Sequence, residues 1–225
     1  MDPDQKMSLD DLHSRLLAIG VDIPKDTLKG WTYRSPPIIT PPIRYKHGKG
    51  SGKKGRAVEW SNESLAEAAA VWAVRNSPRI AHPPSLRLIP FIEHTVLNIY
   101  NEPLAGYDFQ SPGLGKEVTY KSITLELPYP QHPELEGKQP WIEWQELLTT
   151  WIAAKEKAKE GIPLKEPRQV RFHWSAVEKG EGLDYTLEDV TLEPSESDHD
   201  EITIFIGGAD FRKHAFKLLK YVKAF

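Results

Sequence analysis

The chain has 225 residues, of which 39% are hydrophobic and 27% charged, a composition typical of a soluble globular protein with a buried core. It contains no cysteine, which excludes disulfides, thiolate nucleophiles and cysteine-based zinc sites and agrees with a cytoplasmic location. No apolar run approaches the roughly 18–20 residues that span a bilayer, and the first residues lack the pattern of a secretion signal.

The formal net charge of −3 is unevenly distributed along the chain. Residues 1–80 carry 13 basic and 9 acidic side chains, a net charge of +4, whereas residues 81–225 carry 16 and 23, a net charge of −7. Between residues 23 and 60, nine Lys or Arg accompany only two acidic residues, which gives +7. We therefore expect a basic first module that meets any polyanion and an acidic second module that a polyanion repels.

Two short helices are expected at the start of the basic module. Ser8 is a suitable N-cap for the first, whose apolar residues recur at three- and four-residue spacing until Gly20 ends it. Pro24 suits the first turn of a second helix that runs to about residue 33 and turns Leu28 and Trp31 inward. This arrangement predicts a helix-turn-helix.

A basic hairpin is expected to follow these helices. Residues 43–46 and 56–60 suit two short strands, and the loop between them contains four glycines and several lysines. A helix capped by Ser61 or Asn62 then follows to about residue 76. A hairpin beside a helix-turn-helix is a wing, so residues 8–76 predict a winged helix-turn-helix domain.

The remainder predicts an α+β domain at residues 85–225 with an antiparallel sheet, joined by a proline-rich linker at 77–84. A tryptophan stripe within its longest helix (Trp141, Trp144 and Trp151) is typical of a core, and the alternatives are a dimer interface or the wall of a ligand pocket. We expect helices at about 90–100, 140–160 and 209–222, and strands at 118–127, 169–177, 185–192 and 201–206.

No group of residues predicts an enzyme, a metal site or a cofactor. The eight histidines lack the close spacing of metal ligands, and the acidic pairs are typical of solvated surface charge. Gly207 and Gly208 precede an expected helix and could present amides to an anion, but a short Gly-Gly at that place is more typical of a turn.

One set of residues in the first module carries a resemblance to a known family: Gly20-Val21, Thr27-Leu28-Lys29, Trp31, Arg44-Tyr45, Arg56, Trp60 and the helix over 63–74. On these residues the module resembles the DNA-binding domain of the MerR family of winged-helix transcription regulators. That resemblance implies a recognition helix that places Thr27 and Lys29 in the major groove, and phosphate contacts from Arg44, Lys46 and Arg56 on the wing. It also implies a small core of Leu28, Trp31, Leu65 and Trp72.

These observations predict a sequence-specific, cytoplasmic and nucleoid-associated regulator of transcription that binds double-stranded DNA as a homodimer. Its second domain would serve dimerisation, effector sensing or partner binding. Two alternatives remain: a plasmid or phage DNA-organising factor, such as a partition adaptor or excisionase-like protein, and a module that binds proteins and not DNA. The residues expected to contact DNA are Lys25, Thr27, Lys29, Arg34, Arg44, Tyr45, Lys46, Lys49, Lys53, Lys54 and Arg56.

Overall fold

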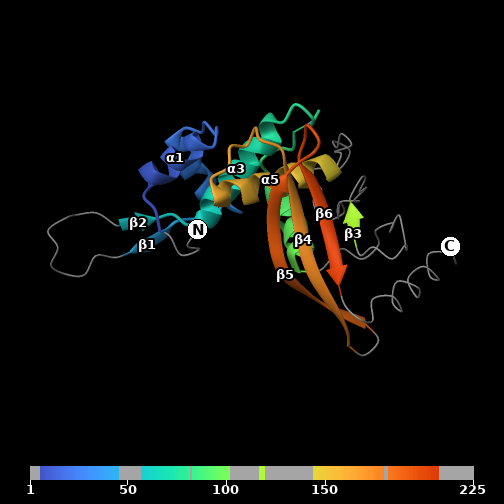
Figure 1. Ribbon diagram of the computed structural model, residues 1–225. Coiled ribbons are helices and arrows are strands. Elements are labelled where there is room, and N and C mark those ends of the chain that lie inside the picture. Colours follow the sequence, from blue (N-terminus) through green and yellow to red (C-terminus); the bar gives the residue numbers. More distant parts are fainter. Residues whose placement is uncertain are drawn as a thin grey trace, which may run out of the picture.

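A computed structural model describes residues 6–45, 57–81, 83–101, 117–119, 144–179 and 182–207 (Figure 1). These residues form a mixed α+β structure, which confirms the expected class. Helices dominate the first half of the described chain, and a four-stranded sheet lies in the second half. None of the described helices is long and apolar enough to cross a membrane.

Helix α1 (Leu9–Ala18) and helix α2 (Lys25–Thr32) form at the expected places. Ser8 closes a capping box with Asp11, in which each side chain bonds to the other residue's backbone N–H. Gly20 has a φ of 86°, a left-handed conformation that suits glycine just beyond a helix end. Leu28 and Trp31 on α2 are buried, as predicted.

Strands β1 (Ile43–Tyr45) and β2 (Ala57–Glu59) pair antiparallel, so the expected hairpin is present. The chain just before α1 joins this hairpin, because Met7 and Trp60 exchange two backbone hydrogen bonds of 3.0 and 2.8 Å. Helix α3 (Asn62–Asn76) follows, and the Ser61 hydroxyl accepts the backbone N–H of Ser64 at its start.

Helix α4 (Ile89–Asn101) and helix α5 (Trp144–Glu160) complete the described helices. Helix α5 packs against α3, and Trp151 on α5 is fully buried in the core, so its predicted place there is confirmed. Trp141 lies outside the described residues, as does the side chain of Trp144.

One hydrophobic core runs through both halves of the described chain, from Met7 to Ile204. Within the segment expected to be a linker, Ile80 is buried in this core, and Arg79 forms an ion pair of 3.6 Å with Glu146 on α5. The turn after α1 is also tied to the second half, since Leu164 donates its backbone N–H to the Ile19 carbonyl at 3.0 Å. The predicted boundary at 77–84 is therefore crossed by packing contacts.

The sheet comprises β3 (Glu117–Thr119), β4 (Arg168–Lys179), β5 (Gly182–Pro194) and β6 (Glu201–Gly207). Its order is β3-β6-β4-β5. One face packs on α4 and α5 (Figure 1). The rings of Tyr100 on α4 and Phe172 on β4 meet edge to face, with their centroids 5.3 Å apart. Buried residues recur at every second position on that face, at Val170, Phe172 and Trp174.

The prediction of a purely antiparallel sheet is wrong at one pair, because β4 and β6 run parallel. Strand β5 returns antiparallel beside β4 and ends at Pro194, opposite Arg168 where β4 begins. The connection 195–200 then passes this end of β4 and starts β6 on its other side, with Glu201 opposite Gln169. Strand β4 lies between β5 and β6. Strand β6 therefore runs parallel to its neighbour β4 and opposite in direction to β5.

A buried lysine holds this connection in place. The Lys157 ammonium lies 2.9 Å from both carboxylate oxygens of Asp200, and it also donates to the carbonyls of Leu164 and Glu166. Asp200 in turn accepts the backbone N–H of Arg168 at 2.8 Å.

Three predictions fall on residues outside those described: the start of the α5 helix at residue 140, the strand beyond residue 119 and the helix at 209–222.

Candidate nucleic-acid interface

One face of α2 is exposed and polar. Lys25, Thr27, Lys29 and Arg34 are all exposed, whereas Leu28 has no exposed surface. The apolar residues of α2 anchor the helix on the core, and the four polar side chains are exposed around the rest of it. Lys25 and Lys29, which are four residues apart, lie on the same side of α2. Thr27 and Arg34 line a hollow that neither lysine touches.

Two of these cations already have carboxylate partners. Lys25 lies 2.5 Å from Asp10 and Lys29 lies 3.3 Å from Asp26, and all four side chains are largely solvent-exposed. The hydrogen bond and charge of Lys25 hold the pKa of Asp10 below its ordinary value. Exposed ion pairs of this kind contribute little to stability, so either lysine can exchange its carboxylate for a phosphate at small cost.

Two predicted residues lie on the first strand of the hairpin. Arg44 pairs with Val58 and Tyr45 with Ala57 in the strand register, and the side chains of Arg44 and Tyr45 are outside those described. The connection between the strands, residues 46–56, has five basic residues and no acidic one. It too lies outside the described residues, and it contains Lys46, Lys49, Lys53, Lys54 and Arg56.

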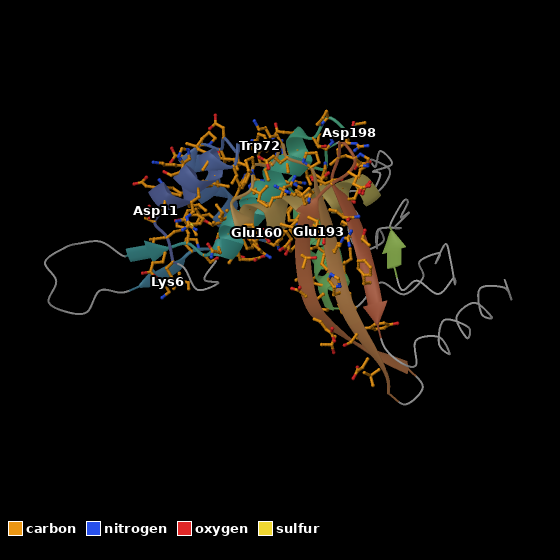
Figure 2. All side chains as sticks on the ribbon, in the orientation of Figure 1. Lys6, Asp11, Trp72, Glu160, Glu193 and Asp198 are labelled. Atoms are coloured by element: carbon orange, nitrogen blue, oxygen red, sulfur yellow. The ribbon has the colours of Figure 1, made fainter. Side chains whose placement is uncertain are left out.

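The base of the hairpin is held by α3 through a buried carboxylate. Glu67 accepts hydrogen bonds from the backbone N–H and from the hydroxyl of Thr40, the latter at 2.8 Å. Ser64 donates its hydroxyl to the Thr40 carbonyl at 3.0 Å. Thr40 lies three residues before β1, so these bonds fix where the hairpin leaves the helices. Lys6 adds an ion pair of 3.3 Å to Glu59 on β2 (Figure 2).

Glu67 belongs to a cluster of three carboxylates, with Glu63 on α3 and Glu93 on α4, whose oxygen atoms lie within 4.8 Å of one another. Such a set could hold a metal ion by ligand type alone. The Lys155 ammonium, however, lies 2.5 Å from Glu63 and 3.1 Å from Glu93, and therefore already supplies a cation. Although burial lowers the pKa of Lys155, the two neighbouring carboxylates raise it above its ordinary value overall.

Trp72 on α3, which is labelled in Figure 2, lines two hollows. The first, of about 630 Å³, lies between the turn after α1, α5 and the β5–β6 connection, and it is lined by both apolar residues and charged residues such as Lys165 and Asp198. The second, of about 660 Å³, lies along the exposed face of α2 and also touches Arg75 near the end of α3.

The sequence reasoning missed Arg75 and Glu67 because their partners are distant in the chain. Arg75 is merely an exposed residue in the last turn of a helix until α3 folds beside α2. Glu67 follows the pattern of a solvated acid early in a helix, yet only 8% of its surface is exposed. Tyr33 is a third residue near this face that was not predicted, and it is 68% exposed at the end of α2.

Comparison of the chain with protein-family models, with curated proteins and with solved structures found no match. The resemblance to the MerR family therefore rests on the residues of the first module alone.

Proposed function

We propose that this protein binds double-stranded DNA sequence-specifically and regulates transcription through a winged helix-turn-helix at residues 8–76. The observation that carries the proposal is the exposed polar face of α2, which lies in the same unit as a hairpin whose connection holds five cations and no acid. Phosphate contacts by lysine and arginine supply most DNA affinity, and a few residues on an inserted helix read base edges.

The roles divide between the two elements. Thr27 and Lys29 on α2 read bases, and Arg34 at its C-terminal end binds the backbone. Arg44, Tyr45 and the cations of residues 46–56 contact phosphates, and the bonds between Thr40 and Glu67 hold the hairpin at a fixed place beside α2. With five or six phosphates neutralised, the logarithm of the affinity falls with the logarithm of the salt concentration at a slope of about −5.

The second half of the chain serves dimerisation, effector sensing or partner binding. We expect a homodimer, because one small winged helix rarely supplies enough sequence specificity and dimers commonly gain it by binding paired half-sites. Gel filtration without DNA tests this: a mass of twice 25.6 kDa at micromolar concentration agrees with it, and a mass of 25.6 kDa contradicts it.

Capture of genomic DNA fragments by the purified protein, followed by sequencing, tests the function itself. Enrichment of a defined inverted repeat upstream of transcription units is the expected result. Enrichment of clustered repeats away from promoters would indicate that the protein organises DNA and does not regulate transcription. If no sequence is enriched even at low salt, the DNA-binding proposal is overturned, and the alternative to test next is an acidic protein partner for the basic hairpin.

A further inference from the structure

Gly30 lies in the last turn of α2, and no contact within the described chain requires a glycine there. A Cβ built at this position would meet no atom within 4 Å. Its backbone is not left-handed, since the positive-φ glycines of the described residues are Gly20 and Gly161. Glycine is the least favourable helix residue after proline. Its presence therefore leaves room at the surface of α2 for a group from outside the chain.

The hollow of about 660 Å³ lies over this position, between α2 and the C-terminal end of α3. Thr27, Gly30 and Arg34 line it from the α2 side, and Trp72 and Arg75 line it from α3. Both arginines are exposed, and within the described part of the chain neither guanidinium has a hydrogen-bond or ion-pair partner. Two guanidinium groups are thus available at one hollow in the face expected to meet DNA.

The charge of the hollow favours an anion. Asp22, in the turn before α2, is the one acidic side chain among its lining residues, so the two arginines leave a formal charge of +1. A guanidinium presents a planar fork of N–H donors that matches the oxygens of a phosphate. The hollow therefore combines steric room, positive charge and donors suited to a phosphate group.

We propose that this hollow seats a backbone phosphate of the bound DNA, with Arg34 and Arg75 as its ligands and Gly30 as the gap that allows its close approach. The inference rests on the proposed DNA binding and extends it. Arg75 becomes a DNA contact on α3, so the contacts with the DNA backbone run from the hairpin across α2 to the end of α3.

Fluorescence anisotropy with a duplex captured by the wild-type protein, titrated at several salt concentrations, tests this assignment. Arg75→Ala weakens binding about three- to tenfold and reduces the magnitude of the salt slope by about 1. Asp22→Asn removes a repulsive charge and tightens binding about two- to threefold. Lys165→Ala removes an exposed cation at the other hollow and serves as the matched control, with no more than a twofold effect.

Gly30→Ala separates the proposed role from a role in folding, because its two readouts move in opposite directions. The alanine favours the helix and raises the melting temperature by about 2–4 °C. It also fills the gap and weakens DNA binding about tenfold. A lower melting temperature would contradict the open space over Gly30.

If the wild type binds the duplex but Arg75→Ala has the same affinity and salt slope as Lys165→Ala, the phosphate site is overturned while the proposed DNA binding stands. Gly30→Ala binding as tightly as the wild type overturns it equally. If the wild type binds no duplex, the proposed function falls, and the phosphate site falls with it.

Discussion

Glu67 makes the stability of this protein depend on pH in a direction opposite to that of an ordinary paired carboxylate. Burial raises the pKa of its carboxyl group from 4.5 to about 7, against the hydrogen bonds from Thr40 that lower it. The charged groups that face it are Glu63 on α3, Glu93 on α4 and Lys155 on α5. The effect of burial exceeds that of these hydrogen bonds and of Lys155.

The raised pKa determines the direction and the size of the change in unfolding free energy with pH. Between pH 4.5 and 7 the unfolded carboxyl group is ionised while the folded one keeps its proton, so the folded state binds more protons. The free energy of unfolding therefore falls as the pH rises through this window and levels off above it. A difference of about 2.5 pKa units corresponds to about 3 kcal/mol.

Glu67→Gln tests this directly, because glutamine keeps the shape and cannot ionise. Urea unfolding followed by tryptophan fluorescence between pH 4.5 and 8 gives the difference in unfolding free energy between variant and wild type. That difference should shift in favour of the variant by about 3 kcal/mol across the range. Glu160→Gln, at an exposed position on α5, is the matched control for the loss of one carboxylate. A flat profile for Glu67→Gln, or a shift in favour of the wild type, would refute the reasoning.

Three other variants probe separate parts of the structure. Ser8→Ala removes the hydroxyl that accepts the Asp11 backbone N–H, whereas the backbone N–H of residue 8 can still donate to the Asp11 carboxylate. We expect the free energy of unfolding to fall by about 1 kcal/mol in urea titrations, and no change would contradict the role of the cap. Lys157→Met leaves Asp200 without its buried partner and lowers that free energy by about 3 kcal/mol, whereas an unchanged melting temperature would show that the ion pair is dispensable. Lys53→Ala with Lys54→Ala weakens binding to all DNA sequences alike and reduces the magnitude of the salt slope by about 2, and a sequence-dependent loss would contradict pure backbone contact.

Local patterns predicted the helices and strands because each depends on residues close together in the chain. The cap at Ser8, the stop at Gly20 and the apolar spacing of α1 and α3 are all local signals, and the structure confirms them. The alternation of apolar residues likewise placed β4, β5 and β6 within a few residues of their ends.

The parallel pairing of β6 with β4 could not be predicted in this way. Alternation shows that a strand has one buried face, but it does not specify which neighbour it joins or in which direction. The connection 195–200 decides the pairing through Asp200, whose partner Lys157 lies 43 residues earlier in the chain.

Buried charges were missed for the same reason. Lysine is normally exposed, so nothing in the lysine-rich end of α5 predicts that two of its lysines are buried. Lys155 and Lys157 are 3% and 1% exposed, because Glu93 and Asp200 meet them from distant parts of the chain. The candidate site shows the same limit: local patterns predicted the polar face of α2, but Arg75 joins it only through the packing of α3.

Selection of DNA fragments by the wild-type protein and by Lys29→Ala, sequenced side by side at fixed salt, tests the central claim most directly. DNA recognition by α2 predicts that the wild type enriches a defined repeat and that Lys29→Ala relaxes the preference at particular base positions while the protein still binds DNA. Enrichment of no sequence by the wild type, or an identical preference in the variant, would contradict recognition of DNA through α2.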